Sequence, residues 1–186
     1  MKNKKKDSRM VLGGKQGILC YLGSMFLVLM LVGSCATTSP KEPLPTYQRD
    51  AVSMTLTASD QVNLYGGLPH ATVLCVYQLS NPGVFEQMLE ELEGVNRLLS
   101  CESFDASVKS RRRIVVQPGE KKVVVMDRAE GARYLGVIAG YYKRMPGSFS
   151  RLIPFPIVET GTFRKEKVLG QIYLNMELGA EGIVKP

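Results

Sequence analysis

The sequence predicts an all-β domain, a two-sheet β-sandwich of about seven or eight strands with one inserted α-helix. Short apolar stretches recur along residues 51–186, separated by turns rich in glycine, proline and asparagine. Such spacing is typical of sandwiches. Several stretches alternate apolar and polar residues, which is the period of a strand with one buried face. Residues 82–99 instead repeat their apolar side chains at helical spacing.

The first two strands are predicted on either side of a glycine-rich loop. Residues 52–57 alternate apolar and polar side chains, and residues 72–79 are rich in β-branched and aromatic ones. Between them, residues 63–69 read Asn-Leu-Tyr-Gly-Gly-Leu-Pro. Two glycines and a proline break both patterns, so we expect a loop.

The helix is predicted to begin at Pro82. Asn81 is a favoured capping residue, and proline suits the first helical position because the N–H that it lacks has no helical partner there. Glutamates occupy the side that we expect to face water. The apolar positions of the helix are Phe85, Met88, Leu89, Leu92, Val95 and Leu99.

The second half returns to strands. Gln117-Pro118-Gly119-Glu120 lies between two valine-rich segments, and its central proline and glycine suit a type II turn. Glycines at positions 136 and 140 mark bulges or close backbone approach in the next segment. The predicted strands are residues 114–116, 123–125, 134–142, 157–162 and 168–178.

The first 34 residues have the features of a bacterial lipoprotein signal. Six lysines and arginines precede an apolar run at residues 18–32, and Val32-Gly33-Ser34-Cys35 places small residues before a cysteine. We expect residues 1–34 to be removed and Cys35 to carry acyl chains. Two alternatives stay open. One is an uncleaved span, because residues 16–40 are uncharged and about 20 apolar residues cross a bilayer. The other is ordinary secretion.

Removing the signal changes the charge of the chain. The full sequence has 24 Lys plus Arg and 17 Asp plus Glu, and the first 34 residues hold six of those cations and one acid. The mature part therefore has 18 cations against 16 acids, which gives no sign of nucleic-acid binding. Residues 35–50 contain three prolines and no apolar period, so we expect the lipidated cysteine to continue into an extended tether.

Several motifs occur in the order in which a known family has them. They are Asn63–Pro69, Val76–Leu79, the turn at 117–120 and Tyr134–Tyr141. From the lipobox to about Leu178, the chain resembles the type VI secretion lipoproteins of the TssJ (SciN) family.

This resemblance implies a transthyretin-like β-sandwich without catalysis, held on the periplasmic face of the outer membrane. It also implies binding to the periplasmic C-terminal domain of TssM and, through TssM, a link to TssL. Gly67 and Leu68 replace the more polar residues of many members, so the detailed chemistry of that loop does not carry over.

The loop at residues 63–70 is the first candidate for partner binding. Its glycines allow close backbone approach, and its leucines and tyrosine offer apolar anchors. The resemblance also implicates the loop between the first two strands in TssM contact. The expected contact residues are Asn63, Leu64, Tyr65, Gly66, Gly67, Leu68, Pro69 and His70. The alternative is a turn whose leucines pack back into the sandwich. A second candidate is the basic segment at residues 141–149, for which a plain turn is the alternative.

The cysteines and the single histidine carry little sign of chemistry. Cys75 and Cys101 form either a disulfide in an oxidising periplasm or two separate thiols. His70 is expected to be a surface or locally hydrogen-bonded residue. The sequence has no motif for a metal, a phosphate or an activated nucleophile, so it predicts no enzyme, no metal and no cofactor beyond the lipid on Cys35.

Three other functions stay open. An envelope sandwich could bind glycan or peptide, with Tyr134, Tyr141 and Tyr142 lining a concave face. An envelope enzyme could use Cys75 or His70. A third possibility is a pilotin-like assembly lipoprotein, which is closer to the type VI secretion role implied by the resemblance.

Overall fold

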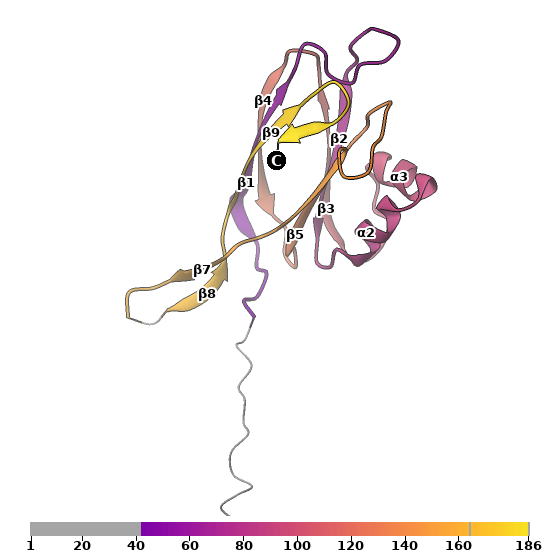
Figure 1. Ribbon diagram of the computed structural model, residues 1–186. Coiled ribbons are helices and arrows are strands. Elements are labelled where there is room, and N and C mark those ends of the chain that lie inside the picture. The colour runs from indigo at the N-terminus through magenta and orange to yellow at the C-terminus, as the bar shows by residue number, and fades with distance from the viewer. Residues whose placement is uncertain (1–41, 164, 186) are drawn as a thin grey trace, which may run out of the picture. The chain divides into compact units, whose positions relative to one another are not determined.

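The computed structural model describes residues 42–163 and 165–185 (Figure 1). Cys35, the predicted signal and the first part of the predicted tether lie outside the described residues. Residues 42–186 form a compact unit by themselves. Within the described residues, no helix is both long and apolar enough to span a membrane.

Two four-stranded sheets build this unit, which confirms the predicted sandwich. The first sheet has the order β10 (Ile183–Lys185), β9 (Ile172–Leu178), β1 (Gln48–Ala58) and β4 (Lys121–Arg128). The second has the order β3 (Val108–Val116), β2 (Thr72–Leu79), β5 (Tyr134–Ala139) and β6 (Ser150–Pro154). A separate hairpin consists of β7 (Ile157–Thr160) and β8 (Glu166–Leu169). The described part of the chain therefore has ten strands, more than predicted. The short edge strands β6 and β10 were not predicted, and the strand predicted at 168–178 is divided between β8 and β9.

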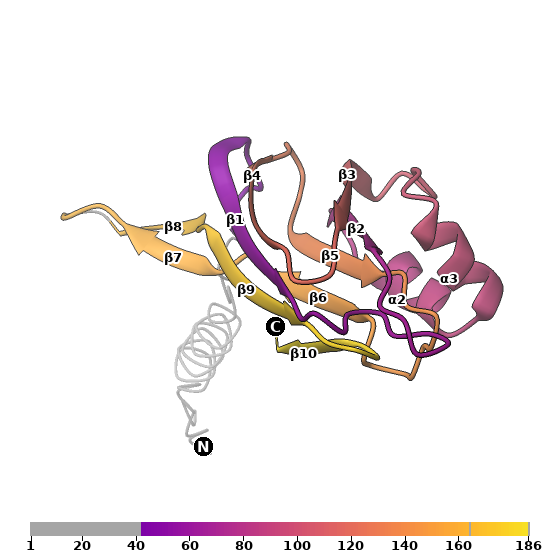
Figure 2. The same cartoon turned by 90° about the horizontal axis from the view of Figure 1, so that it is seen from above.

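The predicted alternation of the first strand places its apolar side chains in the core. Val52, Met54 and Leu56 are fully buried between the sheets. The central strand β2 is buried on both faces. On one face, Gln78 donates a hydrogen bond to the carbonyl of Asp127 (2.7 Å) and accepts one from the N–H of Ala129 (2.7 Å), across to the end of β4. Helices cover the other face (Figure 2).

The prediction of one continuous helix is wrong, because the chain forms α2 (Gly83–Leu89) and α3 (Leu92–Leu99) instead. Glu91 between them is extended, with φ −120° and ψ 142°. The chain then folds back so closely that a β-carbon on Gly94 would lie 2.3 Å from the carbonyl oxygen of Met88. Only glycine fits that contact. At the other end, α2 begins at Gly83 with Pro82 as its N-cap, one residue later than predicted, and the Asn81 side chain accepts a hydrogen bond from the Gly83 N–H (2.8 Å).

Tyr77 and a disulfide fasten the helices to the second sheet. The Tyr77 hydroxyl donates to the Leu98 carbonyl (2.6 Å), and its ring packs edge-on against Phe104. Burial raises the pKa of Tyr77 to about 12. A disulfide joins Cys75 in β2 to Cys101, just after α3. Cys75 therefore offers no free thiol for the enzymatic alternative.

The turn at residues 117–120 has the predicted geometry. Gly119 has φ +72°, and the Glu120 N–H donates to the Gln117 carbonyl (3.0 Å). This turn leads from β3 to β4 and so connects the two sheets. Because β1 and β9 run parallel, the segments after both strands lie at one end of the sandwich, together with this turn. That end carries the candidate site.

Candidate partner-binding surface

The loop between β1 and β2 ends in a tight turn at Tyr65-Gly66-Gly67-Leu68. The Tyr65 N–H donates to the Leu68 carbonyl (2.9 Å), and the Leu68 N–H donates to the Tyr65 carbonyl (3.1 Å). Gly66 and Gly67 have φ +60° and +78°, the type I′ pattern that glycine adopts without steric cost. The turn therefore holds Tyr65 and Leu68 in solvent, 57% and 65% exposed. The alternative in which Leu68 packs back into the sandwich is wrong.

Asn63 fixes the base of this loop. Its side-chain amide donates to the carbonyls of Ala71 (3.4 Å) and Gly140 (3.3 Å), and its Oδ1 accepts from the Tyr142 N–H (2.8 Å). The residue is buried and has φ +52°, a left-handed conformation that asparagine tolerates better than most side chains. Val62, just before it, is fully buried in the core. Asn63 thus positions the loop instead of presenting its own side chain to a partner.

The remaining predicted contact residues are partly exposed. Leu64, Pro69 and His70 are half-buried, and Gly66 and Gly67 are exposed. The Nδ1 atom of His70 is buried without a hydrogen-bond partner among the described residues. Its ring lies edge-on to that of Tyr142, with 4.9 Å between centroids.

The two segments that the sequence singled out separately meet in one surface. Tyr142, from the segment between β5 and β6, stacks on Tyr65 with 4.6 Å between ring centroids. Tyr142 is 56% exposed, so both rings remain accessible. Its neighbour Tyr141 is instead buried, and that burial raises the pKa of its hydroxyl. Exposed Lys143, Arg144 and Met145 extend the surface.

A third segment, between β9 and β10, supports the other two and was missed by the sequence reading. The Leu64 N–H donates to the Ala180 carbonyl (2.8 Å), and the Asn63 N–H donates to the Gly179 carbonyl (3.3 Å). Lys143 forms an ion pair with Glu181 (2.6 Å). The glycines at positions 179 and 182, directly after an alternating strand, were the available signal for a turn here. We call the exposed surface of these three segments the loop surface.

The tyrosines proposed for a ligand-binding face do not gather. Tyr134 begins β5, whereas Tyr142 lies beyond its other end, about 20 Å away along a strand of six residues. A hollow beside the loop surface measures about 260 Å³, below the usual range for ligand pockets of about 300–1,000 Å³. A larger hollow of about 670 Å³ lies beside the start of β1 and contains none of the three tyrosines. Within residues 42–163 and 165–185, no group of three His, Cys, Asp or Glu side chains could hold a metal ion.

A comparison with known protein families identifies the family of this chain. A family model described as type VI secretion lipoprotein, which includes VasD, EvfM and TssJ, matches residues 50–178. The chain belongs to this family. The family resemblance seen in the sequence is thereby confirmed. No curated protein matches the chain significantly.

Solved structures of the type VI system share the fold. TssJ1 from Pseudomonas aeruginosa aligns with a TM-score of 0.54 at 18% identity, covering 76% of this chain and 97% of that one. Serratia marcescens Lip, described as a membrane-bound component of the system, aligns with a TM-score of 0.55 at 20% identity, covering 76% and 98%. A chain in a structure described as the TssM C-terminal domain from EAEC aligns with a TM-score of 0.55 at 14% identity, covering 73% and 96%. At these identities the alignments show a common fold.

Proposed function

We propose that this protein is the outer-membrane-anchored lipoprotein of a type VI secretion membrane complex. Acyl chains on Cys35 hold it on the periplasmic face of the outer membrane. Its loop surface binds the periplasmic C-terminal domain of TssM and so links the outer membrane to TssM and TssL. Family membership supports the setting. The observation that carries the binding site is the rigid turn that holds Tyr65 and Leu68 in solvent.

The arrangement of the domain suits a spacer between membrane and partner. Strand β1 begins beside the segment that leads back toward Cys35 and ends at the loop surface (Figure 1). Its 11 residues span about 35 Å. The loop surface therefore lies at the opposite end of β1 from the segment that leads to Cys35. Anchoring also raises the effective concentration of the domain near TssM, so a modest interface affinity suffices.

A binding measurement tests the loop surface. The soluble domain, residues 36–186, is titrated calorimetrically with the TssM periplasmic domain. Leu68→Asp and Tyr65→Asp should each weaken binding more than tenfold, because both place a charge at an apolar anchor. Leu92→Asp is the matched control, since Leu92 is 70% exposed on α3. Wild-type affinity in both loop variants, with folding intact, would place the interface elsewhere.

A second measurement tests the anchor. Cys35→Ser should give a folded domain that binds TssM in solution but leaves the membrane fraction and no longer supports secretion. Mass spectrometry of the mature wild-type protein should show an acylated N-terminal Cys35. An intact leader, or secretion at wild-type level from Cys35→Ser, contradicts the anchoring proposal.

A further inference from the structure

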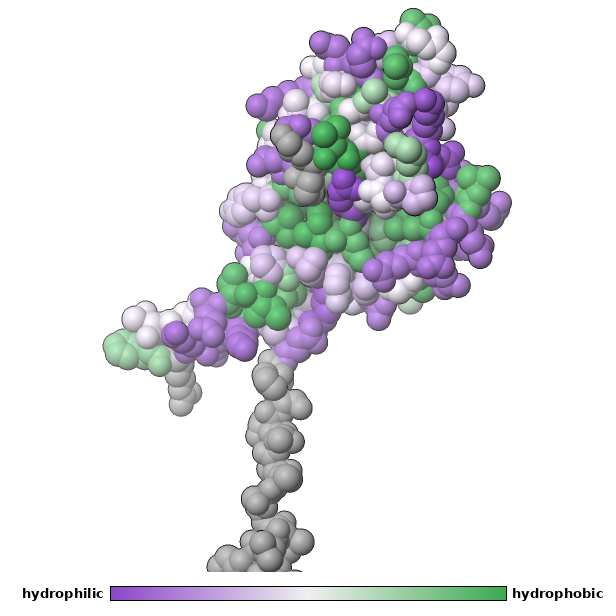
Figure 3. All heavy atoms as spheres, viewed as in Figure 1, coloured by the Kyte–Doolittle hydropathy of each residue, from purple (hydrophilic) through white to green (hydrophobic). Residues whose placement is uncertain are grey.

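The β7–β8 hairpin projects from the sandwich and carries exposed apolar side chains. Figures 1 and 2 show it extending beyond the ends of the neighbouring strands. Phe163 in its turn is fully exposed, at 102% of its reference area. Ile157 and Val158 at its base are 54% and 42% exposed. Figure 3 shows apolar surface at both the base and the outer end of the hairpin. A fully exposed phenylalanine stabilises neither the sandwich nor the hairpin, so its side chain is available for an interaction.

Arg128 holds the base of the hairpin against the start of β1. Its guanidinium donates to the carbonyls of Thr46 (3.0 Å), Leu169 (3.0 Å) and Gly170 (3.2 Å). The same group lies 5.3 Å from the ring centroid of Phe155, just before β7. Arg128 is 2% exposed, and its bonds to Leu169 and Gly170 are buried. The hairpin therefore has a fixed position relative to the first described residues of the domain.

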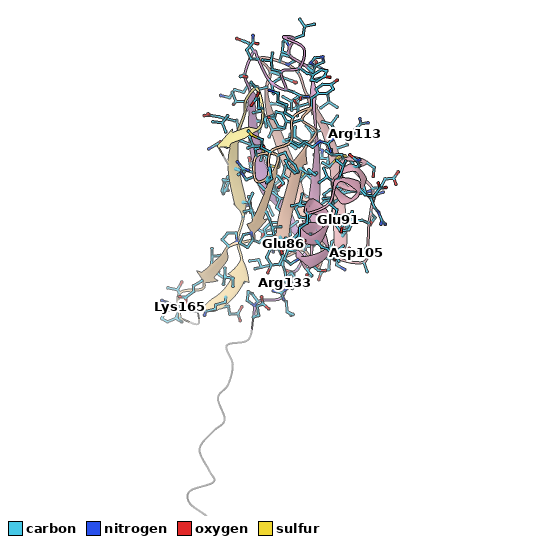
Figure 4. The ribbon with its side chains drawn as sticks, turned by 45° about the vertical axis from the view of Figure 1, so that its right-hand side comes forward. Glu86, Glu91, Asp105, Arg113, Arg133 and Lys165 are labelled. Atoms are coloured by element: carbon cyan, nitrogen blue, oxygen red, sulfur yellow. A yellow bond between two sulfur atoms is a disulfide. The ribbon has the colours of Figure 1, made fainter. Side chains whose placement is uncertain are left out.

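Those first residues lead directly to the predicted lipid anchor. Glu42 pairs with Arg133 (2.8 Å), and Figure 4 shows Arg133 at the same end of the domain as Lys165 of the hairpin. Glu42 follows Cys35 by only seven positions in the sequence, so the anchored cysteine lies at most about 25 Å from it. Phe163 follows Ile157 by six positions in the sequence, so the hairpin reaches about 20 Å. These two lengths are similar, so the turn of the hairpin and the anchored Cys35 can lie at the same membrane surface.

We propose that the turn of the β7–β8 hairpin is a second membrane contact, in which Phe163 inserts into the interface of the bilayer that holds Cys35. The inference rests on the proposed acyl anchor. Aromatic rings favour the bilayer interface. The ammonium of Lys165 pairs with Glu159 across the hairpin (3.3 Å) and is exposed close to the turn, where lipid phosphates can compete for it. Acyl chains already confine the domain to the surface, so weak insertion is enough. Two contacts fix the tilt of the sandwich and direct the loop surface away from the lipid.

The chain contains no tryptophan, which permits a direct test. Phe163→Trp introduces a single tryptophan at the hairpin turn, which is excited at wavelengths that the eight tyrosines do not absorb, and Leu92→Trp places one on α3 as a control. Each full-length lipoprotein is purified in acylated form and reconstituted into vesicles of phosphatidylethanolamine with a minority of phosphatidylglycerol. We expect the emission of the Phe163→Trp variant to shift to shorter wavelength on reconstitution and to be quenched by brominated acyl chains. The emission of the Leu92→Trp variant should not change.

Flotation of the same vesicles separates the two proposals. Protein that floats with the vesicles while the emission of the Phe163→Trp variant is unshifted overturns the hairpin contact and leaves the anchor standing. Protein that does not float overturns both. An emission shift caused by the TssM periplasmic domain, and not by vesicles, assigns the hairpin to a protein partner and also overturns the membrane contact.

Discussion

Tyr65 and Tyr142 come from two different loops, and their rings stack with 4.6 Å between centroids and 17° between planes. Both rings are more than half exposed, so the stack lies on the surface of the domain and not in its core. Each ring restricts the other before any partner arrives. A partner that binds there need not order the rings itself, and such preorganisation favours affinity.

The two rings should therefore act as a unit in TssM binding. Tyr65→Ala and Tyr142→Ala are each expected to weaken binding at least tenfold, but the double variant should lose less than the sum, with a coupling of about 1 kcal/mol. A calorimetric double-mutant cycle measures this coupling. Tyr173→Ala removes a ring that is 75% exposed on β9 and serves as the control. Strict additivity would show that the stack does not preorganise the surface.

Asn63 should control the order of the loop surface through its amide donors. Asn63→Asp keeps the size and the tolerance for a left-handed backbone, but it cannot donate to the carbonyls of Ala71 and Gly140. We expect a loss of stability of roughly 2 kcal/mol, because a charge is also buried, and weaker TssM binding. Asn63→Gly relieves the backbone strain but leaves the same carbonyls unpaired. Denaturant unfolding compares the two variants, and wild-type stability in both would contradict this role.

Much of the fold could be predicted because its main patterns are local. The alternation of residues 52–57, the Pro-Gly turn at 117–120 and the helix entry at 81–83 are each determined by neighbouring residues. The division of the helix was not predictable in this way, since it depends on how Gly94 meets Met88 after the chain has reversed. The hairpin was predicted only in part. Residues 157–162 were predicted as a strand, but β8 was not separated from β9, because apolar residues continue on both sides of the break at Gly170.

The candidate site could likewise be predicted only where its features are local in the sequence. The sequence singled out the segment at 63–70, because it combines glycines with apolar anchors, and the segment at 141–149, because it is basic. It did not reveal that Tyr65 and Tyr142 touch, since the sheet order alone brings those loops together. It also listed Asn63 as a contact residue, whereas the structure buries its side chain as a support.

The disulfide between Cys75 and Cys101 should contribute about 2–4 kcal/mol, because it closes a separation of 26 residues in the unfolded chain. Cys101 has φ +60° directly after α3, a position that glycine favours. Cys75→Ala with Cys101→Gly should therefore be about 1 kcal/mol more stable than Cys75→Ala with Cys101→Ala. Unfolding in guanidinium with and without reductant measures both effects. Equal stability of the oxidised and reduced wild-type protein would contradict the first.

Arg128 should hold the hairpin in place through the planar shape of its guanidinium group as well as through its charge. Arg128→Met removes the donors to Thr46, Leu169 and Gly170, and we expect a loss on the order of 3 kcal/mol, because two buried carbonyls and one partly buried carbonyl lose their partners. Arg128→Lys keeps the charge but not the planar fork, so it should recover only part of the loss. Hydrogen exchange should accelerate at residues 166–171 in both variants. Unchanged exchange there would show that other contacts hold the hairpin.

Asp127 should make the start of β1 sensitive to acid. Its carboxylate accepts hydrogen bonds from the Asp50 N–H (2.8 Å) and the Tyr47 hydroxyl (2.7 Å), and these bonds lower its pKa below the ordinary value. Because the pKa is lower in the folded state, the stabilisation is complete above about pH 4, the range of an unfolded aspartate, and is lost as the pH falls through the folded value. The difference in melting temperature between wild type and Asp127→Asn should be constant from neutral pH down to about pH 5 and shrink below about pH 4. A difference that stays the same down to pH values below the folded pKa would mean that the ionised carboxylate contributes nothing to holding this strand.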